Sequence, residues 1–204
     1  MGAQRVYSDG DEALMRDLRQ QVRTTAPLKA GEQEKLLARA ALGDRASQDR
    51  LVATNLAMVI RLAEGRRELG LSVSDLVLEG SLGFLEAMNT FAQGEGSDFT
   101  AFAERKVGDQ MDAAIASEAA AVRDAEQLVA AATDYERTEL LLAKIVRRAP
   151  TEAEIAEKLE WTVERTRYVA QVVAEARRRH DEELLAFIDP EALDPEAFDD
   201  AVDG

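Results

Sequence analysis

One stretch, residues 75–85, constrains the fold of this chain more than any other. Its apolar side chains recur with the period of an α-helix, which places them along one side of that helix. The apolar stripe comprises Leu76, Val77, Leu82 and Leu85, and it is widened by Leu78 and Phe84. Ser74 or Asp75 can cap the start of the helix. The sequence therefore predicts an amphipathic helix that buries this stripe.

Two glycines, Gly80 and Gly83, lie inside the predicted helix. Each costs a helix interior about 1 kcal/mol relative to alanine. Two glycines three residues apart usually mean that another helix or backbone packs close to them. One interpretation is therefore tight packing inside a helical bundle. The other is that the acidic edge of the helix, formed by Asp75 and Glu79, faces a partner.

The composition favours an all-α fold. Alanine, leucine and glutamate are abundant, and only four prolines interrupt 204 residues. A chain of this length forms one large domain or two small ones. No apolar run approaches the length of a membrane span, and the N-terminus lacks the pattern of a signal peptide. We therefore expect a cytoplasmic protein.

Several kinds of chemistry are not expected. The chain has no cysteine, which excludes disulfides and thiolate metal sites. Its one histidine, His180, has no further ligand at a suitable spacing, so we predict neither a metal site nor a cofactor. It also lacks a phosphate-binding loop and a Cys/His nucleophile pair. An enzyme is therefore disfavoured.

The net charge of −15 argues against a free-standing DNA-binding protein. Phosphate contacts supply most of the non-specific affinity for DNA, and they require a basic surface. A strongly acidic chain suits a protein that docks on a basic partner. Such a protein meets DNA only within a larger assembly.

The periodicity predicts a series of helices separated by short breaks. Residues 1–9 are expected to be a disordered start. A linker near residues 118–127 is an open alternative, although neither glycine nor proline marks it. The expected helices are residues 11–22, 32–42, 45–68, 75–91, 99–121, 123–148, 151–159 and 162–178.

The C-terminal part contains three further signals. Thr151 and Glu154 have the spacing of a capping box, and Trp161 is expected to anchor the core of a helix-turn-helix-like pair. The basic cluster at 177–180 is interpreted as a helix C-terminus, with contact to nucleic acid or an acidic partner as the alternative. The tail, residues 181–204, holds ten acidic residues and no lysine or arginine, so we expect an extended, solvated segment.

Four blocks in order resemble the bacterial sigma factors of the seventy-kilodalton class. The run at 75–84 is similar to D-L-I-Q-E-G-x-x-G-L, the core-polymerase-binding helix of that family. Residues 50–60 resemble R-L-I-x-x-N-L-R-L-V, and residues 96–103 resemble G-x-x-F-S-T-Y-A. Residues 150–156 resemble P-T-x-E-E-I-A, which opens the third domain of the family. The resemblance covers roughly residues 10–185.

The resemblance implies a helical domain two at 10–120, with its polymerase-binding helix at 75–91, and a smaller three-helix domain three at 121–180. The tail at 181–204 would correspond to the acidic linker that enters the active-site cleft of the polymerase, and the fourth region is expected to be absent. The implied partner is a basic coiled coil of the largest subunit of the polymerase core. The implied polymerase-binding residues are Asp75, Leu78, Glu79, Ser81, Gly83 and Leu85.

The strand-reading positions of the family are largely replaced. Arg105 and Lys106 stand where the family has a tryptophan pair, and Asp109 and Asp112 stand where it has a glutamine and a threonine. A stacked aromatic contributes about 1–3 kcal/mol per base, which a flexible cation does not supply. The segment near residues 28–34 corresponds to one that contacts the non-template strand. The DNA-contacting residues expected from the resemblance are Asn55, Phe99, Phe102, Arg105, Lys106 and Arg123, although both phenylalanines could instead be core residues.

The residues that resemble the docking helix are mostly kept, whereas those that read DNA are mostly changed. We therefore predict a sigma-like transcription factor that binds core RNA polymerase and promoter DNA, with a second DNA-binding activator supplying promoter choice. One alternative is a sigma mimic that sequesters polymerase or an anti-sigma factor. The other is a stand-alone, divergent sigma factor.

Overall fold

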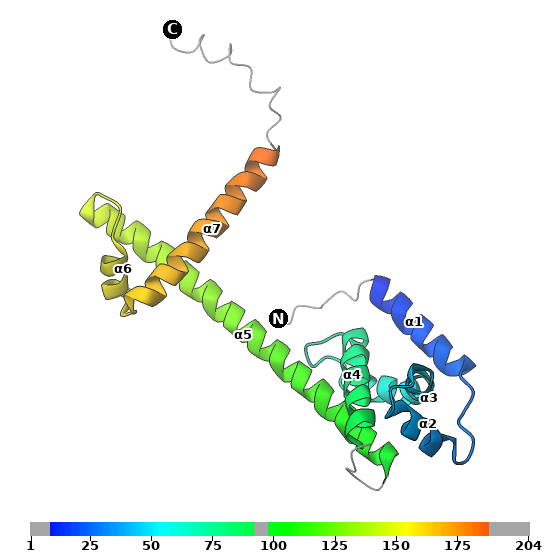
Figure 1. Cartoon of the computed structure of the whole chain (residues 1–204). Coiled ribbons are helices and arrows are strands. Elements are labelled where there is room, and N and C mark those ends of the chain that lie inside the picture. Colours follow the sequence, from blue (N-terminus) through cyan, green and yellow to red (C-terminus); the bar gives the residue numbers. More distant parts are fainter. Residues whose placement is uncertain (1–8, 92–97, 188–204) are drawn as a thin grey trace. The chain divides into compact units, whose positions relative to one another are not determined.

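The computed structural model describes residues 9–91 and 98–187, and these form seven α-helices and no β-strand (Figure 1). The predicted all-α fold is confirmed. None of the described helices is both long and apolar enough to cross a membrane. The helices are α1 (Asp9–Thr24), α2 (Glu32–Ala40), α3 (Arg45–Glu64), α4 (Val73–Phe91), α5 (Phe99–Val146), α6 (Glu152–Leu159) and α7 (Val163–Phe187).

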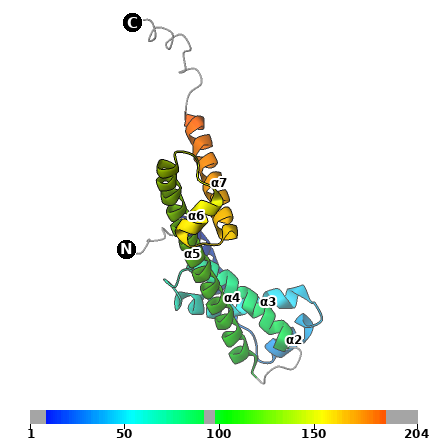
Figure 2. The same ribbon diagram turned by 90° about the vertical axis from the view of Figure 1, so that its left-hand side faces the viewer.

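The chain divides into two compact units, Met1–Val122 and Arg123–Gly204. Helix α5 runs through this division without a break (Figure 2). The sequence predicted two helical runs here, with a linker near 118–127 as an alternative, and the structure corrects this to one helix. The reason is local: neither glycine nor proline interrupts this alanine-rich segment.

The first unit has a core built from α1, α3, α4 and the start of α5. Leu51 of α3, Leu76 and Phe84 of α4, and Val107 and Met111 of α5 are almost completely buried within it. Three phenylalanine rings contribute edge-on contacts, with centroids 5.3–5.7 Å apart. Helix α4 packs against this core along one face.

Helix α4 begins one residue after Ser72, which is its N-cap. The Ser72 carbonyl accepts from the backbone N–H of Leu76, and its Oγ accepts from the backbone N–H of Asp75 at 3.1 Å. The Ser72 hydroxyl also donates to the Asp75 carboxylate at 2.8 Å. The prediction that Ser74 or Asp75 caps this helix was therefore wrong. Ser74 is instead buried and donates to Asp11 of α1.

The buried face of α4 differs from the predicted stripe. Leu76, Val77 and Phe84 are buried as expected. Leu82 and Leu85 are exposed, as is Leu78, so the prediction that these leucines line the core was wrong. The core side of the helix is completed by small residues, because Gly80, Gly83 and Ala87 are buried there.

The two glycines of α4 allow close helix packing, as the first interpretation predicted. A Cβ at Gly83 would lie 2.8 Å from Gln110 Cβ and 2.9 Å from the backbone oxygen of Lys106. A Cβ at Gly80 would lie 2.9 Å from Val59 Cγ1 and would also overlap Met111. The backbone of α4 therefore approaches α3 and α5 more closely than any larger residue allows.

The second unit packs the C-terminal part of α5 against α6 and α7. Its core contains Tyr135, Ile155 and Val169, with Trp161 packed against it. The predicted role of Trp161 as a core anchor is confirmed, and Arg165 lies over its ring at 4.4 Å.

The capping box of α6 is confirmed. The Thr151 hydroxyl accepts from the backbone N–H of Glu154, and the Glu154 carboxylate accepts from the backbone N–H of Thr151 at 2.8 Å. Arg148 also donates to this carboxylate, at 2.6 and 2.9 Å.

Helix α7 extends further than predicted. The cluster at 177–180 lies within this helix, which continues to Phe187, so its interpretation as a helix C-terminus was wrong. Its arginines are held by carboxylates, as in the pairs of Arg177 with Glu136 and Glu139. Residues 181–187 are helical, so the prediction of an extended segment was wrong there. The rest of the predicted tail and residues 1–8 lie outside the described residues.

Candidate functional site

The solvent face of α4 carries a row of exposed leucines. Leu78, Leu82 and Leu85 expose 58%, 56% and 38% of their surface. Their spacing of four and three residues places them along one side of the helix. We call these three residues the leucine strip. A row of exposed leucines on a helix whose other face is fully packed is typical of a docking surface.

Carboxylates border the leucine strip. Asp75 and Glu86 are exposed at its edges, and Asp75 is oriented by its hydrogen bond from Ser72. Glu79 is half-buried, and its Oε2 accepts from Gln110 Nε2 of α5 at 2.9 Å. The strip is therefore an apolar surface with an acidic margin, which favours a partner that is apolar at the centre and basic around it.

Two predicted partner-contacting residues of α4 are used within the chain. Gly83 is buried against α5, so its role is to bring the two helices together. The Ser81 hydroxyl donates to the Val77 carbonyl of its own helix at 2.7 Å. We therefore leave Gly83 out of the proposed contact surface and keep the exposed residues.

The two cations that replace a tryptophan pair lie in different environments. Arg105 is exposed, and its guanidinium carbon lies 5.7 Å from the centre of the Phe102 ring. Lys106 is half-buried, and its Nζ lies 3.2 Å from Oε1 of Glu86 on α4. Of the two, Arg105 is the one available to an incoming phosphate.

Phe99 and Phe102 belong to the core of the first unit. They are 3% and 6% exposed, and both contact Phe91. This is the alternative that the sequence left open, and buried rings do not offer a stacking surface. Neither residue enters the functional proposal.

Asn55 lies at the edge of a groove of about 410 Å³ between the α1–α2 connection, α3 and the start of α5. It is half-buried, and its amide donates to the Leu51 carbonyl of its own helix at 2.8 Å. Its side-chain oxygen is the group it can still offer to a ligand. A contact between Asn55 and DNA stays a prediction.

Carboxylates on α5 engage arginines of the neighbouring segments. Asp112 accepts from Arg66 at 2.6 and 3.0 Å, and Glu104 accepts from Arg61 at 2.6 Å. The hydrogen bond from Arg66 is the main reason that the pKa of Asp112 lies below its ordinary value. Asp112, one of the two acidic replacements, and Glu104 therefore form ion pairs within the first unit.

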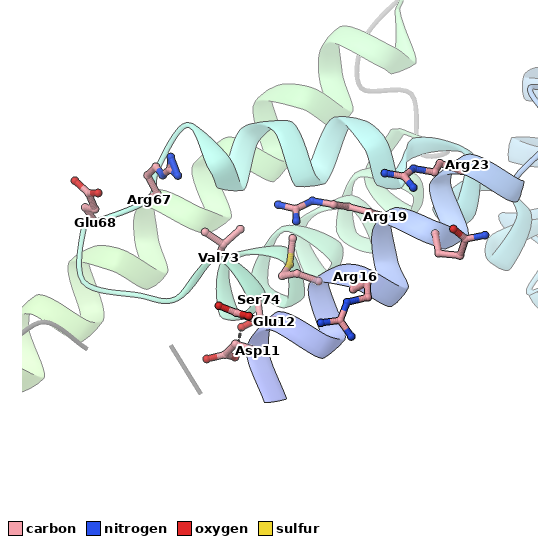
Figure 3. Close-up of a pocket in the computed structure, with 11 residues that line it drawn as sticks. Asp11, Glu12, Arg16, Arg19, Arg23, Arg67, Glu68, Val73 and Ser74 are labelled. Atoms are coloured by element: carbon pink, nitrogen blue, oxygen red, sulfur yellow. Dashed lines mark hydrogen bonds between the residues drawn. The ribbon is translucent and has the colours of Figure 1, made fainter. Parts of the chain in front are cut away.

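A groove lined by arginines lies between α1 and the α3–α4 connection (Figure 3). Arg16, Arg19 and Arg23 come from successive turns of α1, and Arg67 comes from the connection. Its volume is about 600 Å³. Arg19 pairs with Glu64 at 2.8 Å, whereas the other three make no ion pair within the described residues. Acidic side chains also line the groove: Asp11, Glu12 and Glu68.

The arginine groove was missed by the sequence analysis. The spacing of Arg16, Arg19 and Arg23 places them on one side of a helix, and this was the signal that could have found them. Arg67 comes from a distant part of the chain, so its proximity is visible only in the fold. Arg123, the remaining predicted DNA contact, is exposed at the start of the second unit.

Comparisons with known proteins point to sigma factors. The chain is 36% identical over 128 residues to RNA polymerase sigma factor SigA of Synechocystis sp., which covers 63% of this chain and 30% of that relative. It is 33% identical over 127 residues to the SigA of Microcystis aeruginosa, covering 62% and 30%. It is 29% identical over 176 residues to a SigA of a Bacillus species, covering 82% and 47%.

The chain spans less than half the length of these curated relatives. No family model matches it. The similarities support a relationship to the RNA polymerase sigma factors. They cover most of this chain but a minor part of each relative.

Proposed function

We propose that this chain is a sigma-like transcription factor that binds the core of RNA polymerase through the leucine strip of α4. The observation that carries the proposal is the exposure of Leu78, Leu82 and Leu85 on a helix whose opposite face is tightly packed. An apolar centre with a carboxylate margin suits the basic coiled coil of the largest subunit that the resemblance implies. The names of the relatives support the same class of partner.

Promoter choice, in this proposal, comes from a separate DNA-binding protein. Lys106 is engaged by Glu86, and Arg61 and Arg66 are engaged by carboxylates of α5. The net charge of −15 opposes DNA binding outside a complex. Within the complex, the exposed Arg105 and Arg123 supply phosphate contacts.

The arginine groove supports a further contact with the DNA strand inside the complex. Its three arginines without ion pairs are arranged along α1 and beside it, which suits the phosphates of an extended strand.

Retention of core RNA polymerase by immobilised full-length chain tests the proposal. We expect Leu78→Arg to weaken retention at least tenfold, about 1.4 kcal/mol or more, because it places a cation in the apolar centre opposite a basic partner. Leu78 is exposed, so the fold should tolerate the change. Leu42→Arg is the matched control, because Leu42 is 88% exposed and lies outside α4. Equal retention of wild type and Leu78→Arg would contradict the proposal.

A sequestering mimic is the second candidate, because it would use the same docking surface without reading a promoter. The paired cations beside α4 favour it as well. In vitro transcription with core polymerase separates the two functions. Transcription that appears only with an added DNA-binding protein supports the first candidate, and inhibition of another sigma factor supports the mimic. Promoter-specific transcription by the chain alone would indicate a stand-alone sigma factor.

A further inference from the structure

The C-terminal part of α5 carries another exposed apolar face, in the second unit. Leu140, Leu141 and Ile145 expose 61%, 48% and 67% of their surface. Leu140 lies on the side of the helix opposite to Ala131 and Tyr135, which belong to the core of this unit, and Leu141 and Ile145 lie on its exposed flank. The described residues of the unit leave this face uncovered.

Cations lie among these apolar side chains. Arg137 and Lys144 are exposed on the same side of α5, and neither makes an ion pair within the described residues. Arg177 of α7, by contrast, is held by Glu136 at 3.1 Å and by Glu139 at 2.9 Å. We call the uncovered surface the basic–apolar face, and it comprises Arg137, Leu140, Leu141, Lys144 and Ile145.

The chain that follows α7 has the complementary composition. Residues 188–204 hold seven acidic residues and neither lysine nor arginine. Apolar side chains are spread among these acids: Ile188, Leu193, Phe198 and Val202. A segment that combines carboxylates with large apolar groups matches a face that combines cations with leucines.

The tail is also long enough to reach this face. The ion pairs of Arg177 with Glu136 and Glu139 bring α7 beside the start of the face. Helix α7 ends ten residues later, at Phe187, which is a rise of about 15 Å. The seventeen residues from 188 to 204 span up to about 60 Å when extended. The tail can therefore return along α5.

We propose that residues 188–204 dock on the basic–apolar face of their own chain. The carboxylates lie beside Arg137 and Lys144, and the apolar side chains cover Leu140, Leu141 and Ile145. Because the tail is tethered, its effective concentration is on the order of millimolar, so a weak contact is sufficient. The tail then competes with any polyanion or acidic protein for this cationic surface.

A spin label on the tail tests this contact in the full-length chain. The chain has no cysteine, so Ala201→Cys gives a single site for a nitroxide label. We expect the label to broaden the backbone amide signals of residues 137–146. The double substitution Arg137→Glu with Lys144→Glu should abolish the broadening. Lys158→Glu should leave it unchanged, because Lys158 is an exposed cation on α6, outside the face.

A second pair of substitutions tests the other side of the contact. Leu193→Ser with Phe198→Ser lies outside the described helices, and we expect it to remove most of the broadening. The amide signals of Tyr135 and Ile155 report whether each variant keeps the core of the second unit. The proposal is overturned if wild type shows no broadening at 137–146, or if the broadening survives both double substitutions. Isotope-labelled chains without a spin label can also be mixed with separate spin-labelled chains. Broadening of the isotope-labelled signals in this mixture would identify a second copy of the chain as the occupant, and that result would also overturn the proposal.

Discussion

The leucine strip of α4 and the basic–apolar face of α5 are similar in apolar content and opposite in charge. Each exposes three large aliphatic side chains. Asp75 and Glu86 border the first, whereas Arg137 and Lys144 lie within the second. The difference in charge, rather than the apolar area, therefore favours a different partner for each surface. The first suits a basic partner, and the second suits an acidic one.

The two surfaces also differ in what supports them. Behind the leucine strip, Gly80 and Gly83 bring the backbone of α4 against α3 and α5. Behind the basic–apolar face lies the smaller core of the second unit, which is built around Tyr135, Ile155 and Val169. A change in the support of the leucine strip is therefore expected to have the largest effect on folding.

Substitution of Gly83 by alanine tests whether close helix packing supports the leucine strip. Alanine gains about 1 kcal/mol of helix propensity, but its Cβ would lie 2.9 Å from the backbone oxygen of Lys106, which cannot move aside alone. Overpacking of this kind costs about 1–3 kcal/mol, so we expect a net loss of up to about 2 kcal/mol in the free energy of unfolding. Urea denaturation, followed by circular dichroism, measures the change.

Gly65 provides the matched control for this measurement. It lies at the end of α3 with φ of −70°, and an added Cβ would meet atoms at ordinary distances of 3.5 and 3.6 Å. We expect Gly65→Ala to leave stability unchanged or slightly raised. If Gly83→Ala were as stable as Gly65→Ala, the leucine strip would not have the rigid support inferred for it.

Substitution of the cations beside the leucine strip is expected to have the next largest effect, which is on the salt dependence of DNA binding. Lys106 is held by Glu86 at the margin of the strip, whereas Arg105 is free of ion pairs within the described residues. In the assembled complex on promoter DNA, Arg105→Ala should therefore lower the slope of log affinity against log salt concentration by about 1. Lys106→Ala should change this slope less. An equal loss in both variants would mean that Glu86 releases Lys106 when DNA binds.

The sequence predicted the existence of α4 and the close packing at its glycines, because both depend on local spacing. It did not predict which leucines are buried. The apolar side chains of this helix are distributed around much of its circumference, so periodicity alone does not determine which side faces the core. The buried side is the one that carries Gly80 and Gly83, since close approach is possible only there.

The ion pairs of the candidate site depend on distant parts of the chain. Arg61 meets Glu104 across 43 residues, and Arg66 meets Asp112 across 46. The sequence indicated that carboxylates replace strand-reading residues on α5, but their partners follow only from the packing of α3 against α5. The arginine groove was missed for the same reason, because its walls come from separate segments.

The smallest expected effect concerns the ion pair between Arg148 and Glu154 in the second unit, the unit that carries the basic–apolar face. Arg148 follows the end of α5, and its hydrogen bonds to Glu154, together with those from Thr151, lower the pKa of Glu154 from 4.5 to about 2. A lowered pKa stabilises the folded state fully above pH 4.5, and this contribution is lost as the pH falls from 4.5 toward 2.

An NMR titration of the Glu154 side-chain carboxyl carbon should therefore show a midpoint near 2 in the wild type. Arg148→Ala should move this midpoint toward 4.5, because it removes the largest cause of the shift. If the wild-type midpoint lay near 4.5 instead, the ion pair between Arg148 and Glu154 would not form in solution. The second unit would then carry one more unpaired cation than the structure shows.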